Sequence, residues 1–206
     1  INNVTNRNVH NFLAFVQAET PIENLSVKQL YYNLIENPGF ESVDAGTIVG
    51  WKDPNQAWSS DIIFYHEGER CVKTYYLNAP ISQEFYFSPG RQLTLYWSLY
   101  GDQEGENNAQ MTVEFLDASG NALDVIEDVR STMQEWQTFW FTIETPPSTR
   151  KVRVAIEKIA GVEDRNDYIY IDTIMARAGH FENQPEYVDD LWRSISYNGT
   201  LNPGDV

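Results

Sequence analysis

Apolar and polar side chains alternate with a period of two across much of the chain between residues 33 and 178. Such alternation is typical of β-strands that bury one face and expose the other. The apolar members of the clearest rows, which we expect to point into a core, are Leu93, Leu95, Trp97 and Leu99; Met111, Val113 and Phe115; Phe139, Phe141 and Ile143; Val152, Val154 and Ile156; and Ile169 and Ile171. The residues between them are expected to face outward.

Turn-forming sequences separate these rows. They are Asn37-Pro38-Gly39, Ser88-Pro89-Gly90, Ser119-Gly120-Asn121 and Pro146-Pro147-Ser148. Nothing between 33 and 178 predicts a helix that would cross over between parallel strands. The pattern therefore predicts an all-β fold, a two-sheet antiparallel β-sandwich of the jelly-roll type.

The two ends of the chain have a different character. Val9, Phe12, Leu13 and Val16 have helical spacing, so residues 8–18 are expected to form a short amphipathic helix within a helical extension. Residues 180–206 are mostly polar and predict an irregular tail or linker. We therefore expect an extension at 1–32, a jelly-roll domain at 33–179 and a tail at 180–206.

The charge of the chain limits its partners. Lys and Arg number 14 and Asp and Glu number 30, which gives a net charge of −16. Binding to nucleic acid requires a basic surface, and none is apparent, so we expect no nucleic-acid partner. No run of 18 apolar residues is present, so no membrane insertion is expected. Aromatic residues make up 14% of the chain, far more than in a disordered acidic segment.

The sequence offers no recognisable catalytic motif. The three histidines lie far apart, Cys71 is the single cysteine, and no nucleophile elbow, phosphate loop or zinc-binding spacing is present. Carboxylates are so numerous that a chance pair at the spacing of glycosidase residues would carry no information. We expect a protein that is not an enzyme.

Several short sequences, in order, resemble the β-jelly-roll carbohydrate-binding modules, which have the galactose-binding-like fold. They are Asn33 to Glu41 with Gly50-Trp51, Ile81-Ser82-Gln83, Pro89-Gly90 before Leu93 to Trp97, Trp136 to Phe139, and Tyr170-Ile171-Asp172. The resemblance covers about residues 33–178. Domains of this kind occur in glycoside hydrolases, adhesins and bacteriophage tail or fibre proteins, so the resemblance implies an extracellular or virion location.

The resemblance also implies a structural calcium ion. Such modules commonly bind calcium between their first and last strands, and this role falls on Glu41 and Asp172, with backbone carbonyl groups as further oxygen ligands. The alternative is that both carboxylates are hydrogen bonded to backbone or solvated. In the family Asp172 would be followed by a second Asp, and this chain has Thr173 there.

By the same resemblance, the strands near 92–100, 110–117 and 151–158 would share one sheet and form a sugar-binding face. Aromatic rings stack on sugar rings, while charged groups bind sugar hydroxyls. The residues predicted to bind carbohydrate are Tyr96, Tyr100, Arg153, Glu114, Glu157 and Trp58. The alternative is an ordinary solvated sheet with two tyrosines and paired charges.

Parity along the strands places further aromatic residues outside the core. Tyr86, Trp140 and Tyr170 would together form an exposed apolar patch on the other sheet, which isolated domains seldom show. We therefore expect a cover over them, either one of the chain ends or another subunit.

Together these observations favour a non-catalytic domain that binds a polysaccharide or cell-surface glycan within a larger extracellular or virion assembly, such as a tail fibre. The alternative is a structural virion or fibre domain that makes protein contacts without binding glycan.

Overall fold

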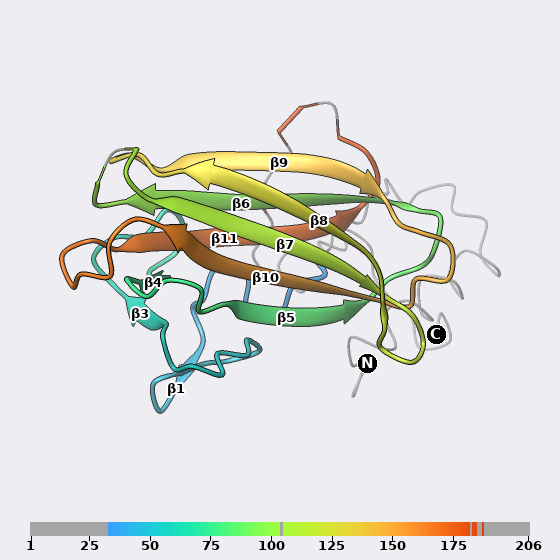
Figure 1. Ribbon diagram of the computed structural model, residues 1–206, viewed down its shortest axis with the longest axis horizontal. Coiled ribbons are helices and arrows are strands. Elements are labelled where there is room, and N and C mark those ends of the chain that lie inside the picture. The colour runs from blue at the N-terminus through green and yellow to red at the C-terminus, as the bar shows by residue number, and fades with distance from the viewer. Residues whose placement is uncertain (1–32, 104, 182, 185–186, 188–206) are drawn as a thin grey trace, which may run out of the picture. The chain divides into compact units, whose positions relative to one another are not determined.

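A computed structural model describes residues 33–103, 105–181, 183, 184 and 187, and all regular structure within them is β (Figure 1). The strands are β1 (Val43–Asp44), β2 (Thr47–Ile48), β3 (Ser59–Asp61), β4 (Cys71–Thr74), β5 (Ile81–Tyr86), β6 (Gln92–Gly101), β7 (Asn108–Leu116), β8 (Ala122–Ser131), β9 (Gln137–Glu144), β10 (Lys151–Ala160) and β11 (Ile169–Ala178). The helix expected at 8–18 and most of the tail at 180–206 lie outside the described residues.

The strands form two antiparallel sheets and a small hairpin. One sheet has the order β5-β10-β7-β8, the other has the order β3-β4-β11-β6-β9, and β1 pairs with β2. From β4 to β7, consecutive strands alternate between the two sheets. The predicted two-sheet antiparallel β-sandwich is confirmed, and its fold is the β-jelly roll.

The core lies between the sheets and is built by the predicted apolar rows. Leu93, Leu95 and Trp97 of β6 are fully buried, as are the inward residues of β7 and β10. The indole Nε1 of Trp97 donates a hydrogen bond to Asp128 Oδ2 on β8 at 3.0 Å, which satisfies the one polar atom of this large side chain.

The outward row of β6 is buried as well, which the alternation did not predict. Thr94, Tyr96 and Ser98 are at most 3% exposed. Ser98 Oγ is hydrogen bonded to the hydroxyl groups of Thr138 on β9 and Thr173 on β11. The expectation of a half-exposed strand is therefore wrong for β6, because neighbouring strands and the segments lying over this face cover its outer side.

A bulge in β11 changes which of its residues face the core. The pairing with β6 shifts between Asp172 and Met175, and Thr173 has a positive φ of 51°. As a result Ile174 joins the core, although parity counted from Ile171 alone would place it outside. The backbone N–H of Ile174 donates to Pro38 O at 3.0 Å, so the bulge also receives the opening segment of the domain.

The strand β8 forms one edge of the four-stranded sheet. It is ten residues long and pairs only with β7 among the described strands. Its outward row includes Leu123, Val125 and Val129, each more than 40% exposed. The sequence analysis did not predict this strand, because its inward row contains Asp124 and Asp128 and so lacks a clear apolar face.

Candidate functional site

The residues predicted to form one sugar-binding face lie on opposite sides of the molecule. Tyr96 and Tyr100 belong to β6 in the five-stranded sheet, whereas Glu114 of β7 and Arg153 and Glu157 of β10 belong to the four-stranded sheet. Since the two sheets pack face to face, their outer surfaces point away from each other. The predicted grouping into one sheet is therefore wrong.

On the four-stranded sheet the charged residues pair with one another. The Arg153 guanidinium contacts Glu84 Oε1 through Nη2 at 2.8 Å and Glu114 Oε2 through Nη1 at 2.6 Å. Lys151 and Lys52 lie 3.5 and 3.8 Å from the Glu84 carboxylate. The hydrogen bond from Arg153 holds the pKa of Glu84 below its usual value. Arg153 and Glu114 are thus paired with each other and with Glu84 on this outer face, as the alternative describes, while their contact with a carbohydrate stays a prediction.

Two of the predicted aromatic contacts are inaccessible. Trp58 is 5% exposed, packs in the core and donates its indole N–H to Ala79 O at 2.7 Å, so it does not line a binding surface. Tyr96 is 3% exposed and stacks with Tyr187, with ring centroids 6.2 Å apart. The predicted contact of these two rings with a ligand is incompatible with this burial.

Tyr100, by contrast, belongs to a group of rings on the outer side of the five-stranded sheet. We call the rings of Phe64, Tyr100, Trp136, Tyr168 and Tyr170 the aromatic cluster. Phe64 stacks on Tyr100 at 5.6 Å and lies 5.3 Å from Tyr170, and Trp136 lies 5.8 Å from Tyr100. Phe64 is 40% exposed whereas Tyr170 is 4% exposed, so Phe64 is the accessible ring of this stack.

A buried carboxylate fixes the loop that carries Phe64. Asp61 Oδ1 accepts the backbone N–H groups of Ile63 and Phe64 at 2.7 and 3.0 Å. Its Oδ2 pairs with Lys73 Nζ at 2.5 Å, and the same ammonium lies 4.7 Å from the centre of the Tyr168 ring. Burial alone would raise the pKa of Asp61, but Lys73 and the two N–H groups outweigh it and lower the pKa. Phe64 is thus held by an ion pair that also borders the cluster.

The sequence analysis missed Phe64, Trp136 and Lys73 as site residues. The available signal was the run Ile62 to Tyr65, four large apolar residues without strand alternation directly before a charged stretch. All four are at least 40% exposed, and Ile63 reaches 76%. Exposed apolar loop residues on a sandwich indicate a binding surface more strongly than the same residues within a strand do.

The three aromatic residues predicted to form a covered patch do not share a surface. Tyr86 is 66% exposed on the four-stranded sheet, with the Lys151 ammonium 5.4 Å from its ring. Trp140 of β9 and Tyr170 of β11 belong to the five-stranded sheet, and Trp140 is half-buried. The predicted single patch is therefore wrong, while a cover over Trp140 stays a prediction.

Glu41 and Asp172, the predicted calcium ligands, both reach the loop at 66–70. Asp172 is fully buried, and its Oδ2 accepts the N–H groups of His66 and Glu67 at 2.8 and 3.1 Å. Glu41 Oε1 accepts the N–H of Glu69 at 2.8 Å. Burial raises the pKa of Asp172 to about 7, and the Glu41 charge contributes to this rise. Both carboxylates therefore accept backbone hydrogen bonds from the same loop.

Solved structures with a similar fold include binding modules and a phage protein. The enzymatically active domain of bacteriophage CBA120 tailspike protein 4 matches with a TM-score of 0.60 at 15% identity, over 72% of this chain and 22% of that one. A family 22 carbohydrate-binding module of Clostridium thermocellum Xyn10B matches with a TM-score of 0.52 at 15% identity, over 72% of this chain and 91% of that one.

A third similar structure contains a sugar. The module TmCBM61, solved in complex with β-1,4-galactotriose, matches with a TM-score of 0.50 at 22% identity, over 72% of this chain and 100% of that one.

No model of a known protein family matches the sequence, and no curated protein sequence matches it. Within the described residues no helix is long and apolar enough to cross a membrane. The matching structures show that the chain has the β-jelly-roll fold of carbohydrate-binding modules.

Proposed function

We propose that the jelly-roll domain binds carbohydrate, without cleaving it, at the aromatic cluster on the five-stranded sheet. The observation that carries this proposal is the stack of Phe64 on Tyr100, with Trp136 beside it and the Lys73–Asp61 ion pair at its border. A flat apolar ring with adjacent charged groups suits a sugar, whose ring faces are apolar and whose edge carries hydroxyl groups.

Two facts support binding rather than catalysis. Asp61 and Glu84 are engaged by basic side chains, which leaves them poorly suited to exchange protons with a substrate. The modules that match over nearly their full length are binding modules by name. The phage tailspike match supports placing this domain in an extracellular or virion assembly, where it would bind a polysaccharide or cell-surface glycan beside other subunits.

A glycan array probed with the chain, followed by calorimetric titration of the best ligand, tests this proposal. We expect Phe64→Ala and Tyr100→Ala to weaken binding about tenfold or more, because one buried aromatic contact is worth about 1.5 kcal/mol or more. Tyr86→Ala is the matched control, since Tyr86 is an exposed tyrosine on the opposite sheet.

An array without any bound glycan would overturn the proposal. Loss of binding in the Tyr86 variant, with unchanged binding in the Phe64 variant, would place the site on the four-stranded sheet instead.

We also propose that a structural calcium ion binds at Glu41 and Asp172. The donor chemistry fits, since both are carboxylates, and a cation would offset the cost of the fully buried Asp172 charge. Glu41 Oε1 lies only 1.9 Å from where a Cβ on Gly68 would stand, so the loop approaches Glu41 closely because this residue is glycine. Among the described residues no third acidic, His or Cys side chain completes a cluster, so backbone oxygens would supply the other ligands.

One observation favours the structural alternative, a fibre or virion domain that only contacts protein. Ile62 and Ile63 are 63% and 76% exposed, and aliphatic side chains match an apolar protein surface better than sugar hydroxyls. If the glycan array is empty, replacing both with Ser and measuring co-assembly with other parts of the parent particle tests this function.

A further inference from the structure

Beyond the aromatic cluster, a second group of exposed rings lies at the same end of the five-stranded sheet. Tyr75 and Tyr76 directly follow β4, and their rings stack with centroids 4.1 Å apart and an interplanar angle of 30°. Their hydroxyl groups are hydrogen bonded at 2.7 Å. Tyr76 is 40% exposed, so this pair presents aromatic surface to solvent.

The tyrosine pair is continuous with the aromatic cluster. The Tyr75 ring meets Tyr168 edge-on at 5.4 Å, Tyr168 lies 6.0 Å from Tyr170, and Tyr170 lies 5.5 Å from Tyr100. With Trp136 beyond Tyr100, successive ring contacts run from the β4–β5 loop across β11 and β6 to the loop before β9. Tyr170, in the middle of this row, is 4% exposed, so the row offers a ligand two groups of rings, Tyr75 with Tyr76 on one side and Tyr100 with Trp136 on the other. A single sugar stacks on one such group, so only a saccharide of several sugars would contact both.

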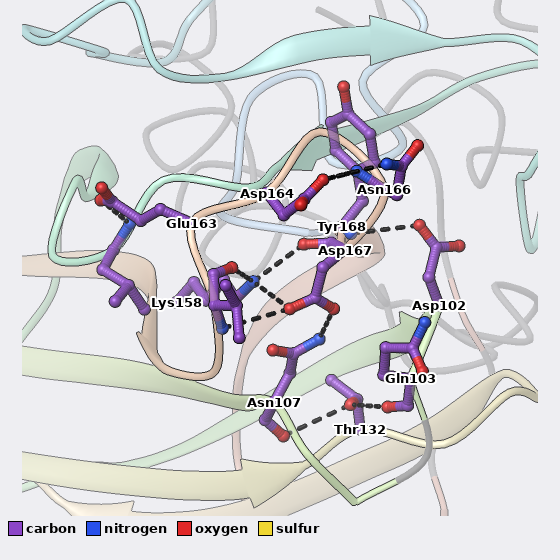
Figure 2. Close-up of polar contacts among 12 residues, drawn as sticks. Asp102, Gln103, Asn107, Thr132, Lys158, Glu163, Asp164, Asn166, Asp167 and Tyr168 are labelled. Atoms are coloured by element: carbon purple, nitrogen blue, oxygen red, sulfur yellow. Dashed lines mark hydrogen bonds and ion pairs between the residues drawn. The ribbon is translucent and has the colours of Figure 1, made fainter.

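Buried polar contacts hold the neighbouring loop at 161–167 (Figure 2). Lys158 is fully buried, and its ammonium donates to Val162 O at 2.8 Å, Asp167 O at 2.8 Å and Asp167 Oδ2 at 3.1 Å. Asp167 Oδ1 accepts from the Asn107 amide on the other side. Because the ammonium and the carboxylate are both fully paired in the interior, the loop has one well-defined arrangement.

This loop in turn holds the tyrosine pair. Glu163 Oε1 accepts the backbone N–H of Leu77 at 2.8 Å, and the N–H of Asn78 donates to Lys158 O at 2.9 Å. On the other side, the N–H of Tyr76 donates to the buried Thr74 hydroxyl at 3.1 Å. The hydrogen bond between the Tyr75 and Tyr76 hydroxyl groups is the main cause that lowers the pKa of Tyr75. Rings fixed in this way lose little conformational entropy when a ligand stacks on them.

We infer that the proposed carbohydrate site extends onto the Tyr75–Tyr76 pair, so that the domain binds a run of several sugars in a linear neutral saccharide rather than one terminal sugar. This inference rests on the proposed function. A neutral ligand is favoured because the chain carries a net charge of −16, which repels polyanionic sugars.

Calorimetric titration with β-1,4-linked galactose, glucose and xylose oligosaccharides, from the monosaccharide to the hexasaccharide, tests the inference. For the wild type we expect affinity to rise with chain length in at least one series. Tyr76→Ala is expected to reduce hexasaccharide affinity about tenfold and leave disaccharide affinity within about twofold, whereas Phe64→Ala should weaken both. Tyr86→Ala is the control, and thermal melting of each variant checks that it is folded.

Wild-type affinity that does not depend on length, or equal effects of Tyr76→Ala on short and long chains, would overturn the inference. Failure of the wild type to bind any of the three series would overturn it as well. The proposed function has its own criteria, because it fails if the glycan array shows no ligand at all or if Phe64→Ala leaves glycan binding unchanged.

Discussion

The fully buried carboxylate of Asp172 shows how position determines the role of a single residue. Its neighbours supply backbone N–H groups, and within the part of the chain that the structure describes no basic side chain is among its hydrogen-bond partners. Another buried carboxylate, Asp167, has the Lys158 ammonium as its partner and a pKa below the usual value. Both residues have the same chemistry, and only the second has its charge balanced by the chain itself.

Removing calcium is expected to lower the melting temperature of the wild type. An ion that binds only the folded state contributes about 2.7 kcal/mol at a free concentration of 100 times its Kd, and a chelator removes this contribution. Asp172→Asn should reduce the difference between melts in calcium and in chelator. Asp117→Asn, which changes an exposed loop carboxylate, should leave that difference unchanged. Identical wild-type melts in calcium and in chelator would contradict the calcium site.

Replacing Asp167 is expected to destabilise the domain strongly. Asp167→Asn leaves the buried Lys158 ammonium without its counter-charge, which costs about 3–5 kcal/mol, and adding Lys158→Met should recover part of this loss. Burial alone would raise the pKa of Asp167, but the Asn107 and Lys158 hydrogen bonds outweigh it and lower the pKa.

The lowered pKa of Asp167 also fixes the sign of a pH effect. Its contribution to the free energy of unfolding is present above the unfolded pKa of about 3.9 and is lost as the pH falls through the folded pKa. Urea titrations between neutral and acidic pH measure this, and we expect a shallower acid decline for Asp167→Asn than for the wild type. Parallel curves for the two proteins would show that Asp167 does not carry the effect.

At the scale of elements, the alternation of residues predicted most long strands but not which sheet each joins. The inward row of β6 was predicted correctly, yet its outward row, with Tyr96 and Ser98, is buried. Parity identifies the two faces of one strand but not the partner of that strand. The strands β6 and β7 follow each other in sequence but lie in different sheets. The side chains of Tyr100 and Glu114 therefore point to opposite sides of the sandwich. Sheet membership depends on long-range pairing that no local pattern encodes.

Glycines in the loops offer a matched test of close packing. Gly161 and Gly120 both have a positive φ, of 112° and 87°, so alanine is strained at either position. A Cβ at Gly161 would stand 1.7 Å from Asn107 Oδ1, whereas nothing lies within 4 Å of one at Gly120. We expect Gly120→Ala to cost about 1 kcal/mol of unfolding free energy and Gly161→Ala clearly more. Equal losses in urea unfolding would mean that the Asn107 contact does not constrain the loop.

At the scale of the whole molecule, residues that follow β11 contact the outer side of the five-stranded sheet. Thr94 donates its hydroxyl to Gly179 O at 2.7 Å, and Tyr187 stacks on Tyr96. Described residues after β11 therefore contact part of this face, whereas a cover over Trp140 by a chain end stays a prediction. The sequence alone did not show which residues of this face would be in contact, because such contacts join residues that are distant in sequence.

Truncation is expected to expose Trp140, which is half-buried on the strand next to Tyr96. In variants that retain Trp140 as the single tryptophan, deleting residues 180–206 or 1–30 should increase quenching of its fluorescence by acrylamide. Large aromatic side chains lose about 2 kcal/mol when they become solvated, so the truncated forms should also associate more readily. Equally strong quenching in every form would show that no chain end covers this ring.

The edge of β8, with which no described strand pairs, has a consequence for how the protein behaves at high concentration. A ten-residue strand with exposed Leu123, Val125 and Val129 is a ready template for adding strands from other molecules. Asp124, Glu127 and Asp128 lie in the same strand. Their negative charges oppose association, because strands of two copies that pair along this edge would bring like charges together. Acidification or high salt weakens that repulsion, so colloidal stability, measured by light scattering, should decline under both conditions while the fold itself is still intact.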